Sequence, residues 1–361
     1  MTTTTIPSEE ILVDCQQVWK IFGEQAPAAM KAITSQGLSK RDVLQKFGCT
    51  VGVSGVSLQV KRGEIFCIMG LSGSGKSTLI RLLNQLIRPT QGRVLVKGKD
   101  LATLDAAGLR NMRAHHIGMV FQSVALLPQR TVLENTAFGL EVQRVPKEKR
   151  NKIAAEALDK VGLADWQHHY PNELSGGMQQ RVGLARAIAS DPEIILMDEP
   201  FSALDPLIRR QLQDEFRTLT KQLGKSAAFI THDLEEAIRI GDRIAIMKDG
   251  VLIQVGTAEE IVRNPADDYV AEFVAGISRL HLVKARSIMR PVAEFRAAYP
   301  DVAIEALPRA AAETDIAELI TLSTLKELDS VAIMGDGSPI GIVSPRDLLN
   351  GIQGNERPAA H

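Results

Sequence analysis

The sequence predicts an α/β fold built on a mostly parallel core sheet. Short apolar runs that suit buried strands alternate with segments of helical periodicity, which is typical of parallel sheets covered by helices. One such run, at residues 65–69, leads directly into a glycine-rich loop and a helix. Another, at residues 193–197, is followed by two carboxylates, Asp198 and Glu199. Polar functional residues therefore follow directly after each of these two buried strands.

Composition limits the classes of protein to consider. The 361 residues suggest two or three domains. The 42 lysines and arginines nearly balance 43 acidic residues, so charge gives no case for nucleic-acid binding. Cys15, Cys49 and Cys67 lack metal or disulfide spacing, which favours a reduced, cytosolic protein. Residues 1–10 do not resemble a signal peptide, and no apolar run is long enough to cross a bilayer.

Local signals define the N-terminal elements. In chain order we expect a strand over residues 11–22, two helices within 24–50, a strand over 51–60, the buried strand over 65–69 and a helix from about Lys76 to Ile87. The second helix of the insertion is expected to begin near Ser39 or Lys40 and to end near Gly48, because serine and glycine are favoured at these two helix ends.

The later elements follow from periodicity and turn residues. We expect mostly helical structure over residues 100–170 with loops near 127–128 and 145–146, a buried strand over 193–197, an amphipathic helix over 207–223, a strand over 227–231 and a hairpin over 244–255. The hairpin prediction depends on the turn pair Asp249-Gly250. From about residue 276 the pattern changes, which indicates a separate C-terminal unit.

Residues 70–77 fit the pattern G-x-x-x-x-G-K-[ST] between a strand and a helix, the context of a phosphate-binding loop. Glycines let backbone N–H groups turn toward the phosphates, and the helix presents its positive end to them. Lys76 supplies charge for the β- and γ-phosphates and Ser77 a hydroxyl for Mg²⁺. An accidental glycine turn is the alternative. The predicted nucleotide-binding residues here are Gly70, Leu71, Ser72, Gly73, Ser74, Gly75, Lys76, Ser77 and Thr78.

The two carboxylates after the second buried strand suit catalysis, because strand ends in such sheets face the ligand crevice. Asp198 is predicted to hold Mg²⁺ through water. Glu199 is then placed to polarise the attacking water as a general base. The alternative is an acidic surface loop after a strand.

His232 and Gln122 each follow an expected strand. His232 is a candidate for contact with the γ-phosphate; the alternative is a neighbour of a helix cap at Asp233. Gln122 is a candidate for contact with Mg²⁺ or the attacking water; the alternative is a surface glutamine. The adjacent histidines at 115–116 and 168–169 lack the spacing of metal ligands.

Together these residues resemble the nucleotide-binding subunit of ATP-binding-cassette (ABC) transporters. The resemblance covers roughly residues 11–275 and depends on residues 70–77, Gln122, residues 174–180, Asp198, Glu199, residues 202–205 and His232. It implies a P-loop NTPase cassette with a mostly parallel core sheet, an antiparallel β subdomain and a helical subdomain at about residues 123–190. ATP and Mg²⁺ are the implied ligands.

The resemblance also implies a head-to-tail homodimer with two ATP sites at its seam. The phosphate loop of one chain would face the signature element (residues 174–180) of the other, through Ser175, Gly176, Gly177 and Gln179. The helix after Gly177 would point its N-terminus at the γ-phosphate, and Asp205 would contact the opposite phosphate loop. Phe22 stands where the family stacks an aromatic ring on adenine; the alternative is an ordinary core phenylalanine.

The helical insertion at residues 24–50 is unusual for the family. With residues 20–23 and 68–76, it resembles the ATPase subunit of glycine betaine/proline-type importers, which take up quaternary amines such as betaines and choline. The implied partners are transmembrane permease subunits and an extracytoplasmic substrate-binding protein, with no nucleic acid. The implied location is peripheral, on the cytoplasmic face of a bacterial inner membrane, with the segment around residues 122–139 contacting the permease.

Residues 276–361 resemble a cystathionine-β-synthase-type (CBS) module, a small α+β domain. The resemblance depends on an expected entry at 287–291, a helix over 311–325, a strand over 331–334, a turn at 335–337 and a strand leading into a helix over 340–347. The family usually carries two such modules and this tail has room for one, so we expect the C-terminal units of two subunits to pair. Nucleotide binding through Ser344 and Asp347 and structural packing are equal alternatives.

Three rival functions stay open. A soluble ABC ATPase acting on ribosomes or DNA would usually carry two cassettes, a long coiled coil or basic surfaces, which this sequence lacks. A pure regulatory nucleotide sensor would not need Glu199 and His232. A third alternative is an importer of another small solute, and only the insertion at residues 24–50 and the C-terminal unit argue against it.

Overall fold

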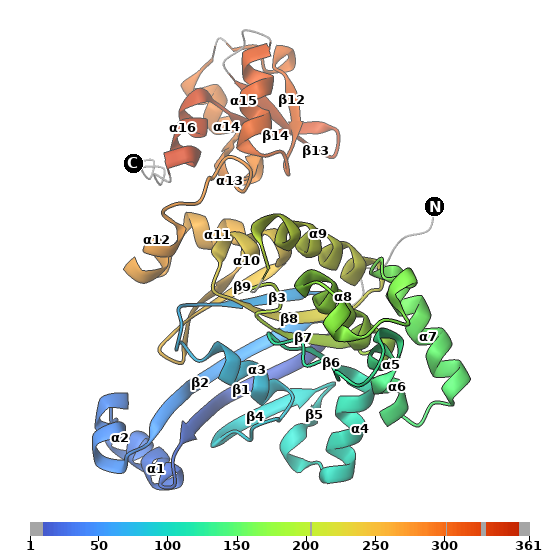
Figure 1. Cartoon of the computed structure of the whole chain (residues 1–361). Coiled ribbons are helices and arrows are strands. Elements are labelled where there is room, and N and C mark those ends of the chain that lie inside the picture. Colours follow the sequence, from blue (N-terminus) through green and yellow to red (C-terminus); the bar gives the residue numbers. More distant parts are fainter. Residues whose placement is uncertain (1–9, 203, 301, 326–329, 354–361) are drawn as a thin grey trace. The chain divides into compact units, whose positions relative to one another are not determined.

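A computed structural model describes residues 10–202, 204–300, 302–325 and 330–353 (Figure 1). Contacts divide the chain into two compact units, Met1–Val255 and Gly256–His361. Helices α11 (Ala258–Arg263) and α12 (Asp268–Val274) lie in the second unit by this division, whereas the sequence analysis assigned them to the ATPase domain.

The six-stranded sheet of the first unit is mostly parallel, as predicted. Its strands lie in the order β10-β9-β3-β8-β7-β6, and β3 pairs in parallel with both β8 and β9. The bounds are β3 Ile65–Met69, β6 Ile117–Val120, β7 Ile194–Asp198, β8 Ser226–Thr231, β9 Arg243–Lys248 and β10 Val251–Gly256. Every residue of β3, β7 and β8 is buried, which explains why their sequences are mostly apolar. Their carboxyl ends meet at one edge of the sheet.

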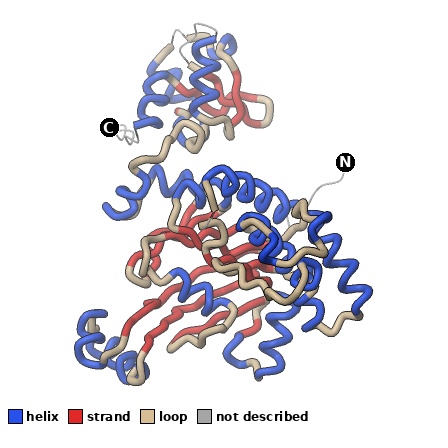
Figure 2. Tube along the Cα trace, viewed as in Figure 1, coloured by secondary structure: helices blue, strands red, loops and turns tan. Residues whose placement is uncertain are grey.

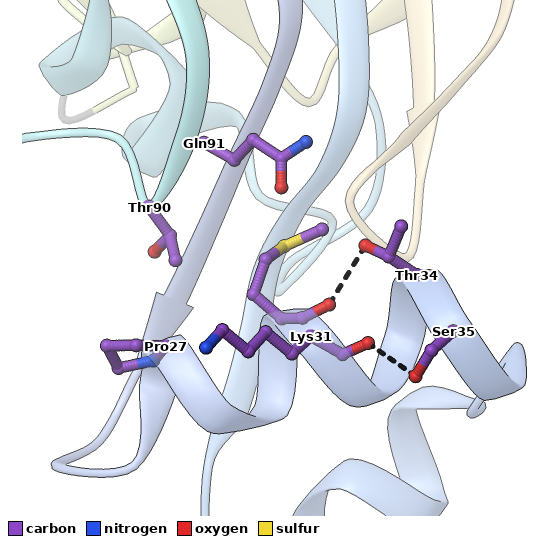
Figure 3. A pocket seen from close by; sticks show the side chains of 7 residues that line it. Pro27, Lys31, Thr34, Ser35, Thr90 and Gln91 are labelled. Atoms are coloured by element: carbon purple, nitrogen blue, oxygen red, sulfur yellow. Dashed lines mark hydrogen bonds between the residues drawn. The ribbon is translucent and has the colours of Figure 1, made fainter.

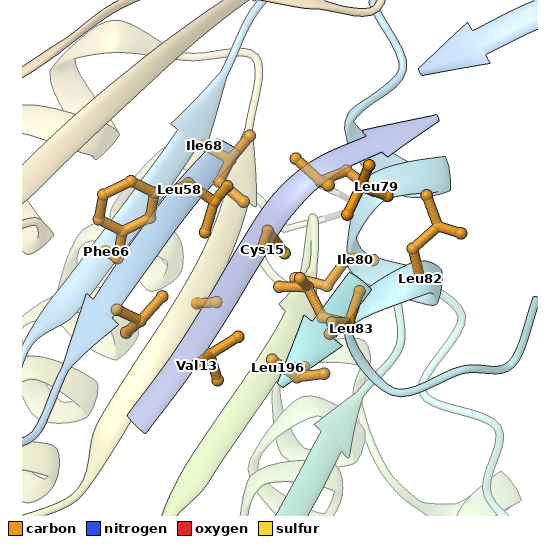
Figure 4. Close-up of a cluster of buried hydrophobic side chains, with 14 of the residues drawn as sticks. Val13, Cys15, Leu58, Phe66, Ile68, Leu79, Ile80, Leu82, Leu83 and Leu196 are labelled. Atoms are coloured by element: carbon orange, nitrogen blue, oxygen red, sulfur yellow. The ribbon is translucent and has the colours of Figure 1, made fainter. Parts of the chain in front are cut away.

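The predicted antiparallel sheet is also present, in the order β2-β1-β4-β5. Its bounds are β1 Ile11–Phe22, β2 Thr50–Lys61, β4 Gln91–Val96 and β5 Lys99–Asp100. Helix α3 (Lys76–Leu83) shares one buried core with both sheets, and Figure 4 shows Leu79, Leu83, Val13 and Leu196 within it. The core therefore fixes the start of α3 against the strands of the two sheets.

Helix α3 ends earlier than the sequence analysis predicted. The helix was expected to reach Ile87, but its last residue is Leu83 and Asn84 is the C-cap. The side-chain carbonyl of Asn84 accepts a hydrogen bond from the backbone N–H of Leu86, and Gln85 has a φ of 53°. A side chain that bonds its own backbone and a left-handed residue together stop the helix.

The two helices predicted within residues 24–50 are confirmed as α1 (Ala26–Gln36) and α2 (Lys40–Phe47). Each ends at a left-handed glycine, Gly37 and Gly48. The helices bury their own small core with strand residues, which consists of Ile21, Ala29, Met30, Val43, Cys49 and Val51. The insertion is thus an ordered part of the first unit.

The first unit contains further helices, which Figure 2 draws in blue beside the red strands. They are α4 Ala106–His116, α5 Val132–Thr136, α6 Phe138–Val142, α7 Lys147–Lys160, α8 Gly176–Ala189, α9 Pro206–Gln222 and α10 Leu234–Ile240, with single 3₁₀ turns at Leu101–Thr103, Ala164–Trp166 and Pro171–Glu173. Within the described ranges, no helix combines the length and apolar character that a bilayer span requires.

An ion-pair cluster joins the two sheets at the amino ends of the parallel strands. Glu193, just before β7, accepts hydrogen bonds from Arg62 (2.6 Å), from Lys97, and from His116 (2.9 Å). Burial raises the pKa of Glu193, but these three donors outweigh burial and lower it to about 2. His116 therefore contributes a structural hydrogen bond to this cluster.

The second unit has a four-stranded sheet in the order β11-β14-β13-β12, with β12 parallel to β13. After α11 and α12 its elements are α13 Ala285–Ile288, β11 Arg290–Pro291, α14 Val292–Ala298, a 3₁₀ turn Ile304–Ala306, β12 Arg309–Ala311, α15 Ile316–Leu325, β13 Val331–Gly335, β14 Ser338–Val343 and α16 Pro345–Gln353. The helix expected from residue 311 begins at Ile316 instead. Ala311 ends a strand, and the Asp315 carboxylate accepts from the N–H of Glu318 at the true helix start.

Candidate functional site

The loop between β3 and α3 forms one wall of a cavity of about 340 Å³. Gly75 is the residue before α3 and has a φ of 100°, which glycine adopts without strain. The cavity is lined by Phe22, Thr50, Val51, Gly52, Ser72, Gly73, Gly75, Lys76, Ser77, Thr78 and Glu199. Six of these belong to the predicted phosphate-loop set, so the expected loop lines a real hollow.

Lys76 lies at the buried base of this loop. Its Nζ donates to the carbonyl oxygens of Gly70 at 2.7 Å and Leu71 at 3.0 Å. Burial lowers the pKa of Lys76, while the nearby Glu199 and Asp198 carboxylates act in the opposite direction. A buried ammonium held by two carbonyls and without a bonded carboxylate is suited to meet a phosphate.

Ser77 and Asp198 meet at the start of α3. The Ser77 hydroxyl donates to Asp198 Oδ1 at 2.9 Å, and Arg81 Nη2 lies 3.7 Å from Asp198 Oδ2. Within the described ranges, no group of three or more His, Cys, Asp or Glu side chains could hold a metal. Mg²⁺ fits this pair nevertheless, because it prefers one or two protein oxygens completed by phosphate and water oxygens.

Glu199 is connected to both His232 and Gln122. His232 contacts Glu199 directly, and Ser202 links Glu199 to Gln122. His232 Nδ1 lies 3.0 Å from Glu199 Oε2. Ser202 Oγ donates to the Glu199 carbonyl oxygen at 3.0 Å and accepts from Gln122 Nε2 at 3.2 Å. Glu199 has a φ of 44°, a strained conformation that such sites often retain. The three predicted catalytic residues thus form one connected group beside the phosphate loop.

Phe22 is an exposed residue at the cavity and does not belong to the core. Its side chain is 41% exposed. Its ring lies so close to Gly52 that a Cβ atom added to Gly52 would be 2.8 Å from Phe22 Cε2. Lys20 Nζ is 5.1 Å from the ring centroid. An aromatic ring exposed at a cavity suits stacking on a planar ligand.

The signature element does not line the cavity of its own chain. Ser175 is the N-cap of α8 and accepts weakly from the N–H of Met178 at 3.4 Å, and both Ser175 and Gly176 are exposed. Gly177 is the second residue of α8 and lies beside Ile208, and Gln179 Nε2 donates to the carbonyl of Pro171 at 3.0 Å. These positions leave the N-terminus of α8 without an acidic partner in its first turn.

Asp205 is likewise a helix cap. Its carboxylate accepts from the backbone N–H groups of Leu207 and Ile208 at the start of α9, at 3.2 and 3.1 Å. Ala203, which belongs to the predicted 202–205 segment, lies outside the described residues. Asp205 is not among the residues that line the cavity.

Sequence reasoning missed a close crossing of three backbones beside the loop. An added Cβ on Gly75 would lie 2.4 Å from the carbonyl oxygen of Gly52, and one on Gly250 would lie 2.7 Å from the same atom. The available signal was Gly52 itself, because a glycine within a strand often marks a close backbone approach.

Comparison with known proteins agrees with this geometry. Residues 53–202 match the family model described as ABC transporter. The glycine betaine/proline betaine transport system ATP-binding protein ProV of Escherichia coli (strain K12) is 54% identical over 280 residues, which cover 78% of this chain and 70% of ProV. The chain belongs to the ATP-binding subunits of ABC transporters. Its fold is the P-loop ABC cassette, and its activity is ATP hydrolysis coupled to transport.

Two further relatives extend the comparison. The trimethylamine N-oxide transport system ATP-binding protein TmoW of Pelagibacter ubique (strain HTCC1062) is 40% identical over 348 residues, covering 96% of this chain and 98% of TmoW. A solved structure described as a dimeric post-hydrolysis state of the ATP-binding cassette MJ0796, bound to ADP and Pi, has a TM-score of 0.57 at 34% identity. The aligned part covers 68% of this chain and 98% of the MJ0796 chain.

The close approach of the Gly75 and Gly52 backbones predicts that one methyl group added at Gly75 strongly weakens ATP binding. We expect Gly75→Ala to weaken ATP binding by about tenfold or more, because the new Cβ meets the Gly52 carbonyl and a non-glycine residue at this φ is strained. Titration of the purified variant with ATP in a calorimeter measures this change.

Gly63→Ala is the matched control, since Gly63 has a φ of 75° with nothing within 4 Å of its added Cβ. It should lower stability slightly, by about 1–2 kcal/mol, and leave ATP affinity unchanged. Equal ATP affinity in both variants would contradict the crossing as a constraint on the site.

Proposed function

We propose that the chain is the ATPase subunit of an importer of quaternary amines, with glycine betaine, proline betaine and choline as the solute class. The observation that supports this most is the 54% identity with ProV, whose name specifies glycine betaine and proline betaine. The helices α1 and α2 of the insertion add support, since they are the feature that distinguished this importer type in the sequence.

In the proposed site, backbone N–H groups of the phosphate loop and Lys76 hold the triphosphate of ATP. Ser77 and Asp198, with Gln122 at the edge, would hold Mg²⁺, which supplies positive charge to the phosphate oxygens when bound. Phe22 stacks on adenine. These assignments are supported by the cavity lining and by the Ser77–Asp198 hydrogen bond of 2.9 Å.

Glu199 is the proposed general base for the attacking water. It lines the phosphate cavity, and His232 Nδ1 lies 3.0 Å from its Oε2, which orients the carboxylate. His232 is proposed to contact the γ-phosphate, because it is bonded to the Glu199 side chain. Gln122 is proposed to contact the attacking water, because Ser202 links it to the Glu199 carbonyl.

A second copy of the chain is proposed to complete each site. The exposed Ser175 and Gly176 begin α8, whose N-terminal N–H groups favour an anion, yet they do not line the cavity of their own chain. Head-to-tail association would bring Ser175, Gly177, Gln179 and Asp205 of one copy to the phosphate loop of the other. The dimeric MJ0796 relative supports this arrangement.

The proposed permease contact is an apolar groove of about 300 Å³ between α4, β6, α6 and α8. Phe138 and Val142 are exposed at this groove, and Arg110, Arg113 and Arg186 contribute positive charge. Such a lining fits a cytoplasmic permease segment with apolar and acidic residues. Binding there would hold the subunit peripherally on the cytoplasmic face of a bacterial inner membrane, below a permease served by an extracytoplasmic substrate-binding protein.

The second unit is proposed to act as a single CBS-like module that pairs with its copy. Within it Asp347 is buried and accepts from Ser344 Oγ at 2.6 Å and from Arg290 Nε at 2.9 Å. This engagement favours structural packing over nucleotide binding for Ser344 and Asp347. Leu349 and Ile352 are exposed on α16, which gives the module an apolar face for pairing.

A second candidate solute is trimethylamine N-oxide. TmoW aligns with 96% of this chain, including the second unit, whereas ProV aligns with 78%. The lower identity to TmoW, 40% against 54%, makes this the second choice.

The role of Glu199 predicts a variant that binds ATP but barely hydrolyses it. Glu199→Gln should lower the rate of ATP hydrolysis by ~10²–10⁴-fold, because an amide cannot accept the proton of the attacking water. ATP binding should persist and dimers should accumulate, as measured by phosphate release and size-exclusion chromatography. Exposed Glu235 on α10 provides the control variant Glu235→Gln, and normal turnover in Glu199→Gln would remove Glu199 from this role.

The solute assignment is tested in the complex of this subunit with its permease and binding protein, reconstituted in liposomes. Glycine betaine, proline betaine, choline and trimethylamine N-oxide are added one at a time, and ATP hydrolysis and uptake are measured. We expect stimulation by at least one betaine, and none in the Glu199→Gln complex. Stimulation by trimethylamine N-oxide alone favours the second candidate, and stimulation by none of the four refutes the quaternary-amine proposal.

A further inference from the structure

The Lys40 side chain links the helical insertion to the turn between β9 and β10, which in turn contacts the phosphate loop. Lys40 is the first residue of α2, whose start is fixed by a reciprocal cap. Ser39 Oγ accepts from the N–H of Asp42 at 3.2 Å, and the Asp42 carboxylate accepts from the N–H of Ser39 at 3.0 Å. From this position Lys40 Nζ donates to the main-chain carbonyl of Asp249, 209 positions away in the turn between β9 and β10.

The same peptide group continues from Lys40 to the phosphate loop. The carbonyl of Asp249 and the N–H of Gly250 belong to one planar trans peptide, so they point in opposite directions. The carbonyl faces Lys40, and the N–H donates to the carbonyl oxygen of Ser74 at 2.8 Å. The turn is also tied to β2, because the N–H of Ser54 donates to the carbonyl of Gly250 at 2.8 Å.

A second peptide group extends the chain into the cavity. The carbonyl of Ser74 shares its peptide plane with the N–H of Gly75. Since Gly250 holds that carbonyl from one side, the N–H of Gly75 points to the other, and Gly75 lines the cavity. The result is a chain of two peptide groups with an ammonium at one end and a phosphate-facing N–H at the other.

Such a chain of hydrogen bonds transmits polarisation from one end to the other. Hydrogen bonds in series polarise one another, so an ammonium on the Asp249 carbonyl makes the N–H of Gly250, and then that of Gly75, a stronger donor. A Cβ added at Gly75 or at Gly250 would lie 2.4 or 2.7 Å from the Gly52 carbonyl oxygen, so the turn packs directly against the loop and β2. Lys40 also stands at a helix N-terminus, where a cation is disfavoured by the helix dipole, so its position is not explained by helix stability.

We propose that Lys40 is a positioning residue for the ATP site, which holds the Asp249-Gly250 turn and polarises the peptide chain that ends at the N–H of Gly75. The ligand it serves is the anionic triphosphate, and its effect is on ATP affinity. The insertion thereby becomes part of the nucleotide site. This inference rests on the assignment of the phosphate loop as the site of ATP.

The test compares three variants of the full chain. Lys40→Met keeps the length of the apolar stem and removes the charge. Lys40→Arg keeps a cation, and Lys46→Met removes an exposed lysine from the same helix. ATP affinity, the KM and kcat of ATP hydrolysis, and the thermal unfolding temperature are measured for each.

We expect Lys40→Met to raise the KM and the Kd for ATP about three- to tenfold with kcat within about twofold of the original protein. Lys40→Arg should restore most of the affinity, and Lys46→Met should change nothing. An unchanged KM and Kd in Lys40→Met, including the case in which only the unfolding temperature falls, overturns the proposal. So does an Arg variant as weak as the Met variant.

Lys76→Ala separates failure of this inference from failure of the proposed site. It should abolish ATP binding, because the buried ammonium at the base of the loop is lost. If Lys76→Ala binds ATP normally, the assignment of the site itself falls. If Lys76→Ala fails to bind ATP and Lys40→Met binds normally, only the role of Lys40 is refuted.

Discussion

The phosphate loop depends on three glycines whose backbones leave no room for a side chain between them. Gly52 comes from the antiparallel sheet, Gly75 from the loop, and Gly250 from the hairpin at the edge of the six-stranded sheet. Because the three segments touch directly, the N–H of Gly250 can hold the carbonyl of Ser74 and fix the loop. Both sheets, the loop and, through Lys40, the helical insertion are joined at this crossing.

One copy of the chain supplies only one side of the proposed reaction site. The loop, Asp198 and Glu199 gather at the carboxyl edge of the sheet, while Ser175 and Gly176 lie exposed at the start of α8. A helix N-terminus without an acidic residue in its first turn favours an anion. In the proposed dimer, ATP held by the phosphate loop of one copy lies at the α8 N-terminus of the other copy. The helix end then has an anion and the loop has its second wall, which is the physical reason for proposing a shared site.

The insertion also carries a surface feature without an assigned role. A hollow of about 660 Å³ lies between α1 and the start of β4, and Figure 3 shows Pro27 and Lys31 of α1 on the side of Thr90, with Thr34 and Ser35 further along the helix. Thr34 and Ser35 donate their hydroxyls back to the carbonyls of Met30 and Lys31. Since these hydroxyls are satisfied within the helix, the lining is mainly apolar and indicates no particular ligand chemistry.

Much of this site could be predicted because its parts are local patterns. The phosphate loop, the carboxylates after β7 and the caps of α2 are each contained in at most ten consecutive residues. The early end of α3 at Leu83 and the late start of α15 at Ile316 were missed, since single side-chain bonds at Asn84 and Asp315 decide them. The contact of Lys40 with Asp249 spans 209 positions, and no local pattern signals such a pairing.

The shared site is tested most directly by a structure of the Glu199→Gln variant of the full chain with ATP. The account predicts a head-to-tail dimer with two ATP molecules, each with its γ-phosphate between Lys76 of one copy and Ser175 and Gly177 of the other. ATP bound in the phosphate loop of a monomer, with its α8 N-terminus facing solvent and no second chain at the phosphates, would contradict the account.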